Sequence, residues 1–387
     1  MPLTSPTHHR LRHLLHAVGV ALCLTAASAF GQDAPAPEPA PEASPAASPA
    51  PAPGVDVSGF IDAYYMYNFN KVDPALRTFD VQHNAFSLSL AEIAFQKTAT
   101  ADSKGGFRVD LDFGKTADLV AAYEPEGSDG KEIYKHIQQA YVSYFASPKL
   151  TLDFGKFVTP IGAEVIESKD NWNYARSFLF GYAIPFYHVG LRGTIAASDK
   201  VTLTGFVLNG WNNSSEIFQG QPCLAVGATV KPSGSVTWIG NFMYGPEHAD
   251  TDVKRSLFDT TLTVTATPKV SLMGNFNYGK DGDTEWWGVA AYAKFQATPA
   301  WALVGRYEYV DDSKGGFMTL GQKGQTFTAT SDHKLPGDVI LRLEYYLNTA
   351  EDPYFPSNTL NPDGSVRTKK SQSTLTAGVV YAFGGKI

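Results

Sequence analysis

Apolar and polar residues alternate along sixteen short segments of the chain. A strand points successive side chains to opposite faces, whereas a helix repeats its apolar face every three to four residues. The segment 106–113 shows the alternation, with polar residues between apolar ones: its apolar members are Phe107, Val109, Leu111 and Phe113. The pattern therefore predicts an all-β protein.

The lengths of the connections predict how these strands are arranged. Connections after even-numbered strands are tight turns, and those after odd-numbered strands are long, apart from 280–285. Outer-membrane barrels combine short periplasmic turns with long external loops. We therefore predict a closed antiparallel transmembrane β-barrel of about sixteen strands, with a water-filled lumen. The predicted strands are 57–69, 84–97, 106–114, 136–146, 149–157, 187–198, 200–211, 223–231, 235–245, 257–267, 269–279, 286–297, 300–310, 325–333, 338–348 and 372–383.

Aromatic residues on the predicted outward face gather near both ends of the strands. Lipid-facing barrels carry such girdles at the headgroup level, although any single aromatic also fits ordinary sheet packing. Near the long connections they are Tyr67, Phe69, Phe113, Phe154, Trp211, Tyr244, Tyr278, Trp287, Tyr309 and Tyr345. Near the short turns they are Phe95, Phe295, Trp301, Tyr381 and Phe383.

The strand 84–97 changes phase part of the way along. Phe86, Leu88 and Leu90 share one parity, whereas Ile93 and Phe95 share the other. One extra residue in a strand produces such a shift, so a β-bulge near Ala91-Glu92 is predicted. The alternative is that two separate pieces have been merged.

The N-terminal segment is typical of a cleaved secretory signal. In residues 1–29, Arg10 and Arg12 precede an apolar run that is too short to span a bilayer, and a small-residue cleavage site follows. Residues 30–54, rich in Pro and Ala, predict an extended periplasmic linker, either passive or bound to the cell wall. The barrel then occupies 55–387, and Cys223 is its only cysteine, so no intramolecular disulfide is expected.

Charge and motifs narrow the function. Cleavage of the signal removes two arginines and takes the net charge from −7 to −9, which argues against nucleic acid as a partner. The remaining histidines have no second ligand at metal-site spacing, and no nucleophile elbow or nucleotide motif is present. No cofactor and no enzymatic activity are expected. A hydrolase with a Ser/His pair at the barrel rim is the weaker alternative.

The longest connection, 158–186, is the main candidate site. It combines charges with the apolar runs 178–180 and 184–186, which a fully solvated loop seldom needs. We predict that it folds into the lumen and that its charges narrow the pore; an external loop packed on its neighbours is the alternative. The predicted constriction residues are Glu164, Glu167, Lys169, Asp170 and Arg176.

Charged residues also lie on the predicted inward face of the strands. They could form a transverse field for polar solutes, or a mutually neutralising lattice that keeps the wall rigid. The predicted lumen-wall residues are Arg108, Asp110, Asp112, Asp153, Arg192, Arg306, Glu308, Arg342 and Glu344. Because the chain is acidic but these arginines oppose its carboxylates, a mild cation preference is expected.

One part of the chain resembles a known family. The block 155–164, GKFVTPIGAE, is followed by Asn171 and by 176–186, RSFLFGYAIPF. With the shorter pieces 59–65, 209–211, 244–247 and 306–309, it closely resembles the OmpL-like outer-membrane β-barrel porins, the β-barrel porin 2 group, over about 57–383. The chain departs from many outer-membrane proteins in ending on Ile387 rather than on an aromatic residue.

The resemblance implies a Gram-negative outer-membrane porin without assigned catalysis. Its expected function is passive diffusion of small hydrophilic solutes or ions, and its expected partners are outer-membrane lipid and those solutes. Fold-level analogy adds a homo-oligomer. The alternative function is a structural or adhesive barrel with a plugged lumen and a cell-wall tether.

Overall fold

The structure is a computed structural model that describes residues 54–125 and 130–386. The chain divides into two units, Met1–Ala50 and Pro51–Ile387, and the second unit holds every strand described below. The predicted signal peptide, 1–29, and all of the predicted linker except residue 54 lie outside the described residues.

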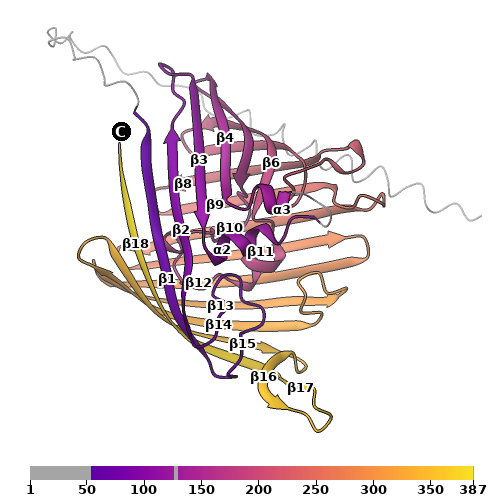
Figure 1. The fold of residues 1–387 in the computed structure, drawn as a ribbon. Helices are drawn as coiled ribbons and strands as arrows, with labels where there is room; N and C mark the ends of the chain where they lie inside the picture. Colours follow the sequence, from indigo (N-terminus) through magenta and orange to yellow (C-terminus); the bar gives the residue numbers. More distant parts are fainter. Residues whose placement is uncertain (1–53, 126–129, 387) are drawn as a thin grey trace, which may run out of the picture. The chain divides into compact units, whose positions relative to one another are not determined.

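Sixteen antiparallel strands form a closed barrel, which confirms the predicted fold (Figure 1). Each barrel strand pairs with the next barrel strand in the sequence, β15 with β18 across the hairpin of the last connection, and β1 pairs with β18 to close the ring. All sixteen predicted strands are present, with ends that differ by a few residues. Their bounds are β1 Asp56–Asn68, β2 Ala85–Lys97, β3 Gly105–Phe113, β4 Ile137–Ser147, β5 Leu150–Val158, β6 Tyr187–Ser198, β7 Val201–Leu208, β8 Cys223–Ser233, β9 Val236–Pro246, β10 Lys254–Thr267, β11 Val270–Asp281, β12 Thr284–Thr298, β13 Trp301–Lys314, β14 Lys323–Leu335, β15 Val339–Ala350 and β18 Ser371–Lys386.

The two faces of the wall differ as the alternation predicts. Phe154 and Leu343 point outward and are exposed, whereas Asp153 and Arg342, one residue away, point inward and are buried. A wall with an apolar outer face and satisfied backbone hydrogen bonds suits a bilayer. Among the described residues, no helix is long and apolar enough to cross a membrane.

The predicted aromatic girdles require one correction. Strand β7 ends at Leu208, so Trp211 lies in the connection after it rather than on the outer wall. Its ring packs edge-on against Trp286 and Phe317, with centroids 6.3 and 5.6 Å away, inside the long-loop end of the barrel. Residues 209 and 210 follow β7. The chain leaves the wall at Gly210, whose φ is +154°.

The predicted bulge in β2 exists, two residues earlier than expected. Against β1, Asp62 faces Leu90 and Ala63 faces Leu88, so Ser89 is the extra residue. Leu90 consequently turns inward and is only 1% exposed, which corrects its predicted outward parity. The same shift turns Glu92 inward.

Several long connections fold back into the barrel. Helix α2 (Lys115–Ala121) packs on the inner face of β2 and β3, where the hydroxyls of Thr116 and Ser89 lie 3.1 Å apart. A second short helix, α3 (Gly130–Ile133), follows it. Strands β16 (Phe355–Leu360) and β17 (Val366–Lys369) form a separate hairpin in the last long connection (Figure 1).

Candidate functional site

The connection between β5 and β6, residues 159–186 and named L3 here, folds into the barrel interior as predicted. It contains the 3-10 turn η1 (Ser168–Asp170) and the π-helical turn η2 (Leu179–Ala183). Its apolar residues join the buried core on the inner side of the wall. Near its beginning, the Gly162 N–H donates to Asp259 Oδ2 of β10 at 3.1 Å; near its end, Trp286 Nε1 of β12 donates to the Ala183 carbonyl at 3.1 Å.

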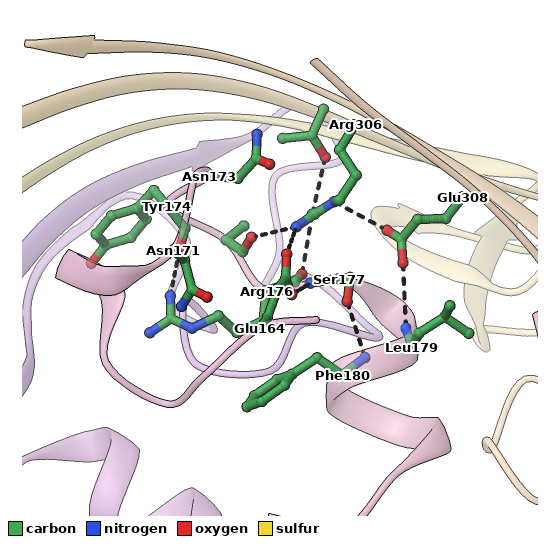
Figure 2. Close-up of polar contacts among 12 residues, drawn as sticks. Glu164, Asn171, Asn173, Tyr174, Arg176, Ser177, Leu179, Phe180, Arg306 and Glu308 are labelled. Atoms are coloured by element: carbon green, nitrogen blue, oxygen red, sulfur yellow. Dashed lines mark hydrogen bonds and ion pairs between the residues drawn. The ribbon is translucent and has the colours of Figure 1, made fainter. Parts of the chain in front are cut away.

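Arg306 of β13 holds the middle of L3 (Figure 2). Its Nη1 lies 2.6 Å from Glu164 Oε1 and donates to the Ala175 carbonyl at 2.8 Å. Its Nη2 donates to the Arg176 carbonyl at 3.2 Å, and Nε lies 3.3 Å from Glu308 Oε2. The Arg306 side chain is fully buried, so its charge is compensated by carboxylates and carbonyls instead of water.

Two carboxylates of the same wall accept hydrogen bonds from the L3 backbone. Glu344 accepts from the N–H groups of Tyr174 and Ala175, at 2.7 and 2.9 Å. Glu308 accepts from the Leu179 N–H at 3.3 Å (Figure 2). Charged acceptors make such bonds stronger than neutral ones.

Arg342 of β15 holds the first half of L3. It pairs with Asp332 Oδ2 at 2.8 Å and donates to the carbonyls of Ser168, Asn171 and Asn173, at 2.5, 2.7 and 3.2 Å. Together the inward charges Arg306, Glu308, Arg342 and Glu344 form what we call the docking wall. The predicted Arg–Glu repeat is real, but it is mostly used to bind L3.

The five predicted constriction residues occupy two kinds of place. Glu164 and Arg176 are buried: Glu164 pairs with Arg306, and Arg176 donates to three carbonyls of L3 itself, those of Val165, Ile166 and Tyr174. These two side chains therefore shape the loop.

The other three are closer to solvent. Lys169 Nζ lies 2.5 Å from Asp170 Oδ2, and the Asp170 side chain is 55% exposed. Glu167 Oε1 accepts from Gln138 Nε2 of β4 at 2.5 Å. Burial raises the pKa of the Glu167 carboxyl, and the hydrogen bond from Gln138 opposes that rise.

Strands β2 to β4, which Glu167 reaches through Gln138, carry a second group of inward charges. Arg108 Nε pairs with Asp110 at 2.8 Å, and Gln139 also donates to Asp110. Glu92 and Asp112 face each other in register. Within the described residues, neither Glu92 Oε2 nor Asp112 Oδ1 has a hydrogen-bond partner. We call Glu92, Arg108, Asp110 and Asp112 the acidic wall.

The last predicted wall pair, Asp153 and Arg192, is a direct cross-strand partnership. The residues face each other in the β5–β6 register, and Arg192 Nη2 lies 2.8 Å from Asp153 Oδ2. The Arg192 guanidinium also lies over the Phe157 ring, 4.7 Å from its centroid. This pair fits the neutralising lattice that the sequence offered as one interpretation.

Sequence reasoning missed several inward carboxylates, among them Asp259, Asp332 and Glu92. Asp259 and Asp332 lie in predicted strands at inward parity, so the alternation alone could have identified them. Glu92 was hidden by the misplaced bulge, because its parity depends on where the extra residue lies.

The described residues also bear on the hydrolase alternative. They contain no group of three or more His, Cys, Asp or Glu side chains placed to hold a metal ion. Ser331 Oγ and His333 Nε2 lie 2.8 Å apart near the short turn after β14. The His333 ring stacks on Trp301, whose Nε1 donates to Ser331 Oγ at 2.9 Å. These contacts form a packed aromatic cluster on the wall, in which His333 and Ser331 both contact Trp301.

Comparisons with known proteins agree on the architecture. A family model described as "Putative beta-barrel porin-2, OmpL-like" matches residues 54–383. The barrel is similar to the outer membrane channel DcaP of Acinetobacter baumannii, with a TM-score of 0.56 and 14% identity over 85% of this chain and 97% of that one. Comparison with curated proteins gives no match.

Two further solved porins share the fold. The anion-selective porin from Comamonas acidovorans has a TM-score of 0.56 and 12% identity over 85% of this chain and 99% of that one. OmpF of Salmonella typhi, solved in complex with daunomycin, has a TM-score of 0.59 and 10% identity over 85% and 97%. At these identities the likeness concerns the fold alone. The family match covers nearly the whole described barrel, and the chain therefore belongs to the OmpL-like β-barrel porin-2 family of outer-membrane proteins.

Proposed function

We propose that this protein is a diffusion porin for small hydrophilic solutes or ions. The observation that carries the proposal is L3 bound along the docking wall, inside a closed sixteen-stranded barrel. A barrel of this size leaves an interior wider than side chains alone can fill. A loop fixed to one side of this interior narrows the passage that solutes would take.

The charges support a mild preference for cations. On the docking wall, acids and arginines neutralise one another. On the acidic wall, three carboxylates face one arginine, Arg108, and Glu167 of L3 lies beside them. Carboxylates in a narrow passage attract cations more strongly than they do in bulk water. The proposed constriction therefore lies between L3 and the acidic wall, with Glu167, Lys169 and Asp170 on the loop side.

A structural barrel with a plugged lumen is the second candidate. One observation favours it: apolar side chains of several long connections, including Phe79, Phe180 and Phe355, form a buried core inside the barrel. In this function the loops would be a plug, and the linker at 30–54 would bind the cell wall.

Conductance separates the two functions. Purified protein in a planar bilayer under a salt gradient should give step-like increases in current. The reversal potential should have the sign expected for a channel that prefers cations. Deletion of 165–175, closed by a Gly-Ser linker, should raise the single-channel conductance, because this part of L3 occupies the interior. The matched control is a deletion of 358–366 in the β16–β17 hairpin. This deletion should leave the conductance unchanged. Absence of channels at high protein dose would reject the porin.

Assembly and location are part of the same proposal. The outer apolar face would contact outer-membrane lipid, residues 1–29 would direct export, and residues 30–54 would lie in the periplasm. OmpT of Vibrio cholerae, which shares the fold with 11% identity and a TM-score of 0.54 over 85% of this chain and 99% of that one, was solved in a trimer form. We propose a homo-oligomer here as well; a monomeric mass in mild detergent would contradict it.

A further inference from the structure

A cavity of about 610 Å³ lies at the long-loop end of the barrel. Four connections and the start of β10 line it, so residues far apart in sequence converge there. Its volume falls within the range of about 300–1,000 Å³ that is usual for small-molecule sites. The residues that matter for binding are Trp211, Glu216, Glu247, Asp250, Arg255 and Phe317.

One side of the cavity is a fixed aromatic cluster. The Phe317 ring stacks on Trp286 with a centroid distance of 3.6 Å and an angle of 4°. Trp211 packs edge-on against both rings. Because each ring is held by the others, Trp211 and Phe317 offer an aromatic surface to a ligand without first having to be ordered.

The one arginine in the lining is already neutralised. Arg255 donates from Nε and Nη2 to Asp281 Oδ2, at 3.0 and 2.6 Å. Its guanidinium lies 5.1 Å from the Trp211 ring centroid and 4.9 Å from that of Phe317. The rings of Trp211 and Phe317 therefore already have one cation over them in the structure itself.

The remaining lining charges are acidic. Glu216, Glu247 and Asp250 face the cavity, and the ring of His248 is paired with Asp281 at 2.8 Å. With Arg255 neutralised, the cavity has an excess of negative charge beside aromatic faces. That combination attracts cations and repels anions.

We propose that this cavity binds organic cations: solutes that carry an amine or other cationic nitrogen on an aromatic or apolar body. The nitrogen lies toward Glu216 and Asp250, and the body packs on Trp211 and Phe317. This inference rests on the proposed function and deepens it. In a diffusion porin, the cavity would concentrate organic cations at the entrance of the channel.

Glu247 makes the binding depend on pH. Both its oxygens accept from the backbone N–H of Trp211, at 3.0 and 2.9 Å. Burial raises the pKa of Glu247 to about 7, against the opposing effect of Arg255; Asp281 raises it further, and the Cys223 thiol donates to it. Since the raised pKa leaves the carboxyl neutral below about 7 and anionic above it, affinity for a cation rises between pH 6 and pH 8.

The test uses three ligands with the same ring. The full-length protein in detergent is titrated calorimetrically at pH 8 with benzylamine, benzyl alcohol and benzoate. We expect benzylamine to bind at least about fivefold more tightly than the other two, since only it combines the ring with a positive charge. Equal or tighter binding of benzyl alcohol would overturn the proposal in favour of a site for neutral solutes, and equal or tighter binding of benzoate would overturn it in favour of a site for anions.

Charge-removing variants locate the site. Glu216→Gln with Asp250→Asn should weaken benzylamine binding about fivefold, as expected for the loss of two carboxylates near the bound cation. Glu351→Gln with Asp352→Asn removes the same charge from another long connection, outside this cavity, and should leave the affinity unchanged. Equal weakening by both pairs would mean that diffuse charge at the barrel mouth, and not this cavity, attracts the ligand.

The binding proposal and the porin proposal can be rejected independently of each other. Channels in a bilayer without benzylamine selectivity in calorimetry would reject this inference and leave the porin intact. Selective binding without channels would reject the porin and leave the site intact. Affinity that does not rise from pH 6 to pH 8 would contradict the assigned role of Glu247.

Discussion

The docking wall and the acidic wall are built from the same kind of inward-facing charged strand, yet they differ in how their charges are balanced. On the docking wall, Arg306 and Arg342 meet carboxylates and L3 carbonyls, and the result is a fixed loop. On the acidic wall, Glu92 and Asp112 face each other in register, and Glu92 Oε2 and Asp112 Oδ1 have no hydrogen-bond partner among the described residues. The comparison teaches that balanced charges in a barrel hold structure together, whereas the proposed cation preference depends on a region where carboxylates outnumber arginines.

Breaking the docking wall should have the largest effect. Arg306→Met leaves Glu164 and Glu308 buried without their cation, and removal of one partner from a buried pair costs about 3–5 kcal/mol. We expect the urea midpoint of unfolding to fall by an amount that corresponds to this free energy. We also expect larger fluctuations of the single-channel current, because L3 is held less firmly. Tryptophan fluorescence in detergent measures the first effect and bilayer recording the second.

The matched control is Arg108→Met on the acidic wall. The Arg108 side chain is 32% exposed, and Asp110, which its removal leaves buried, keeps the hydrogen bond from Gln139. The loss of stability should therefore be clearly smaller than for Arg306. Equal losses would mean that the two walls do not differ in the way described.

Neutralising the acidic wall should change selectivity more than stability. In Glu92→Gln with Asp112→Asn, a like-charge pair becomes a pair of amides, which removes repulsion and supplies hydrogen-bond donors. We expect the reversal potential under a salt gradient to move toward anions, with an unfolding midpoint that is unchanged or higher. A wild-type reversal potential would place the ion path elsewhere.

Single variants of L3 should separate the roles of Glu164 and Glu167. Glu167→Gln should move the reversal potential modestly toward anions, whereas Glu164→Gln should mainly lower stability, because Arg306 loses its partner. The raised pKa of Glu167 also predicts that cation preference declines with acidification at a higher pH than an ordinary carboxylate would give. Identical behaviour of the two variants in both assays would contradict the assignment.

An exposed pair should give the smallest effect. Lys314 Nζ lies 2.8 Å from Glu285 Oε1, but the Lys314 side chain is 62% exposed. Ion pairs in solvent contribute little, so Lys314→Gln should leave the unfolding midpoint and the reversal potential unchanged. A measurable loss of stability would show that exposure is a poor guide to these charges.

Local information explains what could be predicted. The two-residue alternation and the lengths of the connections were enough to predict all sixteen strands. Both signals depend only on residues that are close together in the sequence. The inward fold of L3 was also predictable, since 178–180 and 184–186 need an apolar environment. The position of the β2 bulge could not be predicted, because one extra residue fits the alternation at several places. The inward orientation of Glu92 was missed for the same reason.

The partners of L3 were beyond local reasoning. Glu164 and Arg306 are 142 residues apart, and the alternation says only that Arg306 points inward. The docking of one segment on another depends on the path of the whole loop through the interior. Individual roles within the constriction therefore stay predictions for conductance experiments, as do the signal peptide and the linker.

The pairing of β1 with β18 has a consequence for the order of assembly. Asp56 lies opposite Lys386 and Asn68 opposite Thr374, so the first strand of the barrel is completed only by the last. Until that strand is synthesised, both borders of the growing sheet carry unpaired N–H and C=O groups, which hydrocarbon does not tolerate. Membrane insertion must therefore await an almost complete chain, and loss of the final strand would leave an open sheet prone to pair with its neighbours.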